Sequence, residues 1–226
     1  MKKIVIAIDG PAASGKSTTA KLVAERLGYL HLDTGAMYRA ITLRAIRENV
    51  PLRDAERMGT LARNSQIGLK RAGNGNRVFL QDEDVTEEIR TPEVSRQVSA
   101  VSSHPTVRAV LVEQQRHLAR DGGVVLEGRD IGTVVFPSAE LKIFMVADIT
   151  ERARRRRGDL AKTGVQLDDE AVAKEIIDRD TIDSTREASP LKKAADAIEL
   201  DTSGLTIEEQ VEFIVNKATE IMQQRS

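Results

Sequence analysis

Residues 10–17 read GPAASGKS and match the pattern G-x-x-x-x-G-K-[ST]. In such a loop the backbone N–H groups turn inward and hold phosphate oxygens at the start of a helix. Lys16 would reach the β- and γ-phosphates, and the Ser17 hydroxyl would take one position around an Mg²⁺ ion. The pattern therefore predicts a nucleoside triphosphate site, against the alternative of a chance match in a glycine-rich turn.

Arginines recur at many separate points outside this loop, and phosphoryl transfer between two nucleotides would use them. Catalysis of that reaction is mostly positioning and charge neutralisation, and a guanidinium holds phosphate oxygens in a bidentate manner. The sequence contains neither the Asn-Lys-x-Asp of a GTPase nor the Ser-Gly-Gly of an ABC-type ATPase. The arginines in question are Arg39, Arg108, Arg129, Arg154, Arg155, Arg156, Arg157, Arg179 and Arg186.

Several of these arginines have an ordinary structural interpretation as well. The run at 154–157 is typical of a solvated helix face. Arg179, Asp183 and Arg186 share one helical face at i, i+4 and i+7, where surface ion pairs are common. Arg129 differs, because it directly follows an apolar run in VVLEGRD. Residues at the carboxyl ends of parallel strands face the ligand crevice, so this position favours a functional role.

The elements that would position these residues alternate between strand and helix. This order indicates a parallel sheet covered by helices on both faces. We expect strands at 3–9, 29–32, 124–127, 141–146 and 197–201, and helices at 15–27, 35–49, 92–102, 105–120, 150–162, 168–185 and 206–223.

Residues 62–92 interrupt this alternation. Two short extended runs at 66–70 and 77–81 flank Gly-Asn-Gly-Asn, which is a strong hairpin signal. The sequence therefore predicts a small antiparallel insertion.

Composition narrows the class of protein. The 226 residues suffice for one large domain, and the net charge of −1 gives no overall attraction to nucleic acid or to an anionic membrane. Without cysteine there are no disulfides and no thiolate sites, and His31, His104 and His117 lack metal-ligand spacing. The first apolar run is too short for a signal peptide or a membrane span, so we expect a cytoplasmic protein.

Beyond these patterns, the whole chain resembles the bacterial cytidylate kinases, the (d)CMP kinases of the nucleoside-monophosphate kinase superfamily of P-loop NTPases. The loop at 10–17 is generic, whereas GRDIGTVVFP and the hairpin before EIRTPEVS are much more specific. The segments that carry the resemblance are IDGPAASGKST at 8–18, LDTGAMYRA at 32–40, EIRTPEVS at 88–95, EGRDIGTVVFP at 127–137, LKIFMVADITERARRR at 141–156 and RDTIDSTREASPL at 179–191.

The resemblance implies an α/β P-loop kinase fold with a parallel five-stranded sheet flanked by helices. It divides the single unit into a core at 1–33, 121–151 and 165–226, a monophosphate-binding region at 34–120 with the hairpin at about 62–92, and a short lid at 152–164.

It also implies a set of site residues. The ATP-binding positions are Gly10, Pro11, Ala12, Ala13, Ser14, Gly15, Lys16, Ser17, Thr18, Arg155, Arg156 and Arg157. The CMP-binding positions are Thr34, Ser99, Arg108 and Asp130 for the base, Arg39, Arg129 and Arg186 for the phosphate, Tyr38 beside it, and Arg179 and Asp183 near the sugar. Lys16, Arg129 and Arg186 would be catalytic, and Asp33 would join Ser17 at the metal as an outer-sphere partner.

The implied reaction transfers the γ-phosphoryl group of ATP to CMP or dCMP, giving CDP or dCDP and ADP, with Mg²⁺ as cofactor. The expected enzyme is a monomer of pyrimidine nucleotide metabolism whose partners are these small molecules. Two other functions stay open: a kinase for UMP or a small metabolite hydroxyl, and a non-catalytic ATP-dependent switch.

Overall fold

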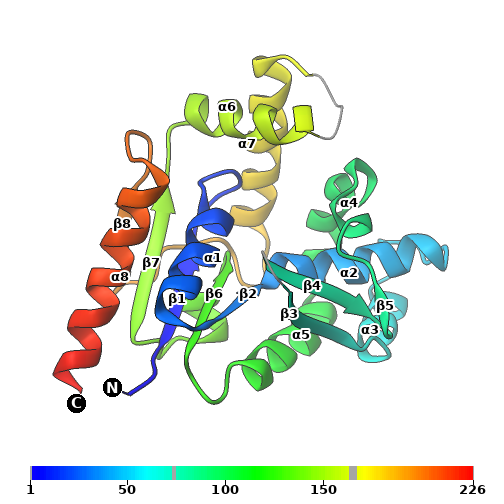
Figure 1. Ribbon diagram of the computed structural model, residues 1–226. Coiled ribbons are helices and arrows are strands. Elements are labelled where there is room, and N and C mark those ends of the chain that lie inside the picture. Colours follow the sequence, from blue (N-terminus) through cyan, green and yellow to red (C-terminus); the bar gives the residue numbers. More distant parts are fainter. Residues whose placement is uncertain (1, 73–74, 163–166, 226) are drawn as a thin grey trace.

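A five-stranded parallel sheet forms the centre of the computed structural model, which describes residues 2–72, 75–162 and 167–225 (Figure 1). The strand order is β2-β6-β1-β7-β8, and every neighbouring pair is parallel. The strands are β1 (Val5–Asp9), β2 (Leu30–Asp33), β6 (Val124–Gly128), β7 (Leu141–Val146) and β8 (Ile198–Asp201). This result confirms the predicted fold class.

Helices cover both faces of the sheet because the strand side chains alternate between two apolar clusters. On one face Ile6 and Ile8 pack with α1 (Lys16–Leu27) and α8 (Ile207–Gln224). On the other face Ala7 and Leu126 pack with α2 (Thr34–Arg47) and α5 (Pro105–Leu118). The chain leaves each strand at the same edge of the sheet, so the segments after β1, β2 and β6 meet there.

The predicted insertion is a three-stranded antiparallel sheet beside α2. It comprises β3 (Ile67–Ala72), β4 (Gly75–Leu80) and β5 (Glu83–Asp84), and the short η1 (Glu88–Arg90) follows. Val78, Leu80 and Val85 pack against Ala36, Ala40 and Leu43 of α2, which ties the insertion to that helix.

Two further helices of this region flank the insertion. α4 (Pro92–Ser102) follows it, and α3 (Ala55–Arg63) precedes it. The sequence patterns did not predict α3, and the expected start of the insertion at residue 62 lies inside this helix.

The helices α6 (Ile149–Lys162) and α7 (Asp169–Thr185) rise beyond the carboxyl edge of the sheet (Figure 1). Ala153, Val172 and Ile176 form a small apolar cluster with Ala12 of the loop after β1. The expected lid at 152–164 is therefore helical as far as Lys162, and its last two residues lie outside the described residues. Across the described chain, we find no helix with the length and apolar character that a bilayer crossing requires.

Candidate functional site

The P-loop, residues 10–17, connects β1 to α1 and has a backbone that only glycine permits at two points. Gly10 has φ +152°, and a Cβ there would lie 2.2 Å from the carbonyl oxygen of Met145. Gly15 has φ +94° at the start of α1. This conformation places the loop against β7 with its amides at the N-terminus of the helix, where an anion is favoured.

The amine of Lys16 folds over this loop. Its Nζ donates to the carbonyl of Pro11 at 2.6 Å and to the Ser14 hydroxyl at 3.3 Å. Burial and, after it, the nearby charge of Arg129 lower the pKa of Lys16 to about 7. A phosphate beside the amine would reverse this shift, so the lysine is poised to respond to an anion.

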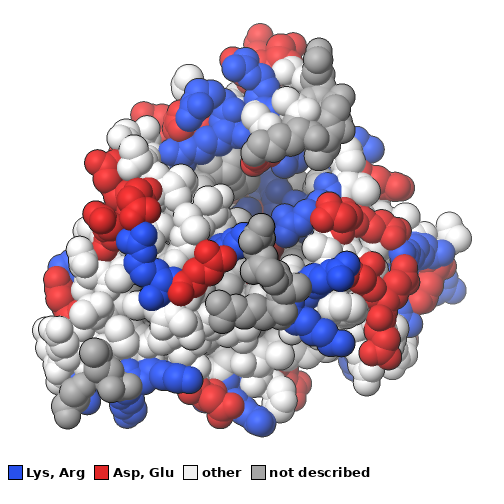
Figure 2. Space-filling model, viewed as in Figure 1, with Lys and Arg blue, Asp and Glu red and all other residues white. Residues whose placement is uncertain are grey.

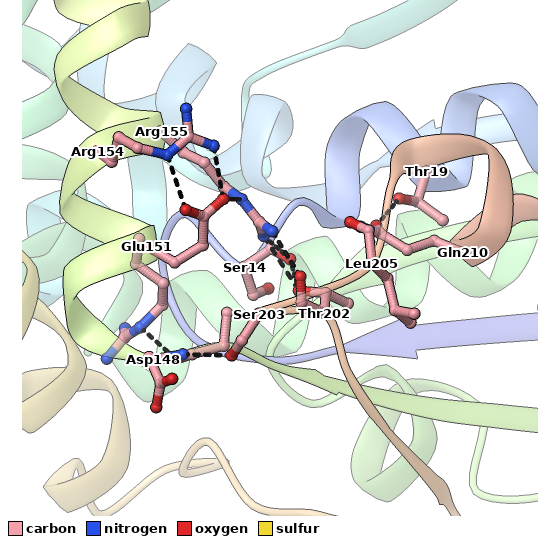
Figure 3. A network of polar contacts seen from close by, with 12 residues as sticks. Ser14, Thr19, Asp148, Glu151, Arg154, Arg155, Thr202, Ser203, Leu205 and Gln210 are labelled. Carbon is pink, nitrogen blue, oxygen red and sulfur yellow. Dashed lines mark hydrogen bonds and ion pairs between the residues drawn. The ribbon is translucent and has the colours of Figure 1, made fainter.

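Arg155 fastens α6 to the P-loop (Figure 3). Its guanidinium donates to the Ser14 carbonyl at 3.1 Å, to the Thr202 hydroxyl at 3.0 Å and to the Thr202 carbonyl at 2.6 Å. Thr202 also donates to the Ser14 carbonyl, at 3.0 Å. The structure thus brings Arg155 to the predicted ATP loop, where it binds backbone carbonyls and Glu151.

The other arginines of α6 differ in their surroundings, and Arg154 shares Glu151 with Arg155. Arg152 pairs with Asp180 of α7, and Asp180 accepts from the Ala12 amide at 2.9 Å. Arg157 pairs with Asp169 at 2.7 Å. Arg156 lies close enough to Arg39 and Arg179 for its charge to lower the pKa of both. Among the arginines predicted to contact ATP, Arg156 is therefore the one whose charge adds to the cationic cleft.

Arginines also crowd the cleft after β6. Burial lowers the pKa of Arg39 to about 10 and that of Arg179 to about 9, and neighbouring guanidinium groups add to both shifts. In Figure 2, Lys and Arg side chains gather in the hollow below α6 and α7. Crowded, partly desolvated positive charge of this kind favours a polyanionic ligand.

Two ion-paired carboxylates lie beside this charge. Arg129 Nε donates to Asp183 at 2.8 Å, and Arg108 pairs with Asp130. Arg186 lies 3.7 Å from a carboxylate oxygen of each aspartate. Asp130 thus pairs with the neighbouring Arg108, whereas Arg129 pairs with Asp183. The structure therefore shows an ion-pairing role for Asp130 beside its predicted contact with the base.

The remaining predicted residues surround this group. The Arg108 guanidinium lies over the Tyr38 ring, 5.3 Å from its centroid. The Thr34 hydroxyl donates to the carbonyl of Glu127 at 2.7 Å, and Ser99 is buried on α4. Arg39 donates to the Ile89 carbonyl and to the Ser95 hydroxyl. The residues expected to contact CMP therefore come from α2, α4, α5, α7 and the segment after β6.

Sequence reasoning missed Glu127 and gave His31 no role, yet Glu127 contacts the predicted metal ligand Ser17, and His31 contacts Glu127. Ser17 Oγ donates to Glu127 at 2.6 Å, and His31 Nε2 lies 3.1 Å from the other Glu127 oxygen. Burial alone would raise the pKa of Glu127, but the contacts with His31 and Ser17 hold it below its ordinary value. The sequence did contain a signal for Glu127, because it is the one acidic residue in the otherwise apolar strand VVLEG.

The donor set here fits Mg²⁺. Asp33 and Glu127 lie side by side in register on β2 and β6, and the Asp33 carboxylate also caps α2 at the Ala36 amide. Burial and then the charge of Glu127 raise the pKa of Asp33, a cost that a cation would relieve. Across the described residues no group of three or more His, Cys, Asp or Glu forms a metal cage. Mg²⁺ needs few protein ligands, so a hydroxyl and neighbouring carboxylates suffice.

A comparison with known protein families gives one decisive match: the family model of cytidylate kinases covers residues 6–220. The chain belongs to the cytidylate kinase family. It is 50% identical to the cytidylate kinase of Bacillus subtilis (strain 168) over 225 residues, which are 100% of this chain and 99% of that protein. It is 54% identical to the cytidylate kinase of Pelotomaculum thermopropionicum over 215 residues, 95% of each chain.

Membership of the cytidylate kinase family confirms the resemblance seen in the sequence, and the protein is a kinase, an enzyme that transfers a phosphoryl group. An uncharacterized protein from Eubacterium ventriosum has a similar fold, with a TM-score of 0.51, 11% identity and coverage of 96% of this chain and 99% of its own. That likeness concerns the fold alone. The roles of the individual site residues stay predictions.

Proposed function

We propose that the enzyme transfers the γ-phosphoryl group of ATP to CMP or dCMP and releases ADP with CDP or dCDP. The observation that carries this proposal is the buried Arg108–Asp130 pair, with Arg186 3.7 Å from the same aspartate. A carboxylate acceptor and a guanidinium donor that are buried side by side can form hydrogen bonds with the donor and acceptor groups of a nucleotide base. The relatives are named cytidylate kinases, which supports cytosine as that base.

The donor side would hold the ATP phosphates with the P-loop amides and Lys16. The Lys16 amine can leave the Pro11 carbonyl for a phosphate oxygen by a side-chain rotation, because the two lie on the same loop. It would then absorb charge that develops on the β- and γ-phosphates in the transition state. Arg156 would add charge from the helix above.

Ser17, Glu127 and Asp33 are the residues that would hold Mg²⁺. When bound there, the ion would neutralise charge on the β- and γ-phosphates. Glu127 orients the Ser17 hydroxyl, and His31 in turn orients Glu127.

On the acceptor side Asp130 would accept the amino hydrogen of cytosine, and Arg108 would donate to the N3 and O2 acceptors. Uracil offers a carbonyl where cytosine has the amino group, so it would face a carboxylate and be rejected. Arg39, Arg129 and Arg186 would hold the CMP phosphate. Its attacking oxygen is already largely ionised near pH 7, so no general base is needed.

The sugar end of the site supports both acceptors. Asp183 would accept from a ribose hydroxyl, yet it already pairs with Arg129 at 2.8 Å and lies 3.7 Å from Arg186. A buried carboxylate with two cationic neighbours is not left unpaired when the 2′-hydroxyl is missing. We therefore expect dCMP and CMP to be used at comparable rates.

A coupled assay of ADP formation with CMP, dCMP, UMP, AMP and GMP tests the proposal. Turnover with CMP and dCMP at least tenfold above that with the other three is the expected result. Preferential turnover of UMP would favour the alternative kinase. If the protein binds ATP but forms no ADP when CMP is added, the result would favour a non-catalytic switch.

A further inference from the structure

Asp9 ends β1 directly before the P-loop, but its side chain turns away from that loop towards the segment after β6. Its two carboxylate oxygens accept from consecutive backbone amides, that of Ile131 at 2.8 Å and that of Gly132 at 2.7 Å. The side chain is buried, with Asp9 only 5% exposed. None of the roles described above uses this carboxylate.

The two amides belong to the turn that presents Asp130. That turn, η2 (Ile131–Val135), begins at the residue after Asp130. The Asp130 carbonyl accepts from the amides of Val134 and Val135 at 2.9 and 3.2 Å. Asp9 therefore holds the N–H of the peptide that follows Asp130 and that of the next peptide, and the turn holds the C=O of the first of these two peptides.

The atoms around the contact between Asp9 and the Gly132 amide are closely packed. A Cβ on Gly132 would lie 3.2 Å from Cδ of Lys142 and 3.4 Å from Oδ2 of Asp9. The absence of a side chain at Gly132 thus lets the carboxylate approach both amides. Lys142 directs its amine to Asp196 at 2.7 Å, so it does not neutralise Asp9 directly.

We propose that Asp9 is a positioning residue that sets the base specificity of the acceptor site by fixing the backbone on which Asp130 stands. This inference rests on the proposed function, because it assigns Asp130 to the cytosine amino group. Asp9 does not touch the substrate; its effect passes through the Ile131 and Gly132 amides.

The ionisation of Asp9 predicts a pH dependence that can be measured. Burial and, to a smaller extent, the charge of Asp130 raise the pKa of Asp9, while the two amides and Lys16 lower it; together they place this pKa at about 6. From β7, the neighbouring cation is Lys142, which is paired with Asp196. When Asp9 is protonated, one oxygen carries a hydrogen that faces an N–H, so one of the two contacts is lost. The turn should therefore loosen as the pH falls through about 6.

The test compares wild type with Asp9→Asn by the ratio of kcat/KM for CMP to that for UMP between pH 5.5 and 8. The ratio cancels the ionisation of the nucleotide phosphate and of groups that serve ATP, such as Lys16. In wild type the ratio should fall towards low pH with a midpoint near 6. In Asp9→Asn it should be about tenfold lower at pH 8 and flat with pH, as expected when a contact to a charged group is lost.

A merely structural role would give a different result. The folded-state pKa of Asp9 lies above its unfolded value, so its ionised form destabilises the fold at neutral pH. The melting temperature of Asp9→Asn should thus be no lower than that of wild type, with the KM for ATP unchanged and the KM for CMP raised. Equal losses with CMP and UMP, or a lower melting temperature with an unchanged ratio, would overturn the proposal.

Two further variants complete the experiment. Gly132→Ala adds a methyl group 3.4 Å from Oδ2 of Asp9 and so disturbs the same contact. It should lower the ratio of kcat/KM for CMP to that for UMP by a smaller factor than Asp9→Asn does. Asp121→Asn removes an aspartate whose side chain is 89% exposed and should leave the ratio unchanged. Hydrogen exchange of residues 129–136 needs no substrate, and it should be faster in Asp9→Asn at pH 8. If wild type does not phosphorylate CMP the proposed function fails, while unchanged exchange would refute the role of Asp9 by itself.

Discussion

Arg108 and Asp130 form an ion pair in which neither side chain is more than 6% exposed. They reach each other from α5 and from the end of β6, and Arg186 stands 3.7 Å from the second Asp130 oxygen. Loss of either partner would leave a buried charge uncompensated, at a cost of about 3–5 kcal/mol. The pair therefore stabilises the fold, in addition to its proposed role in recognising the base.

Replacing Asp130 with Asn tests these two roles. The amide keeps one acceptor oxygen and adds a donor, so uracil is no longer opposed at its carbonyl. We expect kcat/KM for CMP to fall roughly 10–10³-fold and that for UMP to change far less. Asp130→Ala should show the same loss of preference with a lower melting temperature. Equal losses for CMP and UMP in the Asn variant would make Asp130 a structural partner only.

Lys16 should report ATP binding through protons. Its pKa is lowered to about 7 in the free protein, and the phosphates of ATP raise it again. At pH 8 the amine is mostly neutral before binding and charged after it, so ATP binding should take up close to one proton. Calorimetric titrations in two buffers of different ionisation enthalpy measure this number. At pH 6 the uptake should vanish, since the amine is charged in both states.

Lys16→Met is the matched variant for that experiment. It should bind ATP without proton uptake at pH 8, and its phosphoryl transfer should be slower by about 10²–10³, as for the loss of one charge stabiliser of about 3–4 kcal/mol. Undiminished uptake in this variant would assign the titration to another group. Turnover within about threefold of wild type, with an unchanged circular dichroism spectrum, would show that Lys16 does not stabilise the transition state.

Glu127→Gln should raise the Mg²⁺ concentration needed for half-maximal rate by about 10–100-fold, in the range known for residues that orient metal ligands. The amide can still contact Ser17, but it lacks the negative charge next to Asp33. Activity titrated with MgCl₂ at saturating ATP and CMP measures the shift. Glu48→Gln, an exposed change on α2, should leave the titration as in wild type. An unchanged Mg²⁺ requirement in Glu127→Gln would show that Glu127 serves only to orient Ser17.

The insertion should matter to the monophosphate through Arg39. That guanidinium is held by the Ser95 hydroxyl at 2.8 Å and by the carbonyl of Ile89, both of which follow the antiparallel sheet in the chain. Ser95→Ala should raise the KM for CMP by about threefold to tenfold, the effect of one hydrogen bond to a charged group. The KM for ATP should not change. Thr219→Ala, which removes a hydroxyl that bonds only the Val215 carbonyl within α8, is the control. An equal rise in both KM values would show that Arg39 does not act on the CMP phosphate specifically.

Much of the fold could be predicted because its signals are local. The strands are short apolar runs, and Gly10, Lys16 and Ser17 form a pattern that depends only on spacing along the chain. α3 was missed, since AERMGTLAR has a glycine in its middle and its apolar face is covered by residues distant in sequence.

The candidate site was harder to predict where pairing decides the geometry. The sequence placed Arg129 and Asp130 together at the end of β6, but it could not show that each would pair with a different helix. Glu127 and His31 stand on neighbouring strands, and only the register of β2 against β6 brings them to Ser17. Strand register is a property of the assembled sheet, so no single segment carries that information.

The pairing of β1 with β6 also fixes the spacing of the two segments that we propose to bind the substrates. Asp9 and Gly128 are register partners at the ends of adjacent strands, and the P-loop and Arg129 start from the next residue of each. Neighbouring strands lie about 4.8 Å apart. The two segments that we propose to bind the donor and acceptor phosphates thus begin one strand spacing apart, which favours binding of both ligands in a single site. The hydrogen-bonded pairing of β1 with β6 would therefore fix the distance between the two proposed phosphate sites before any ligand binds.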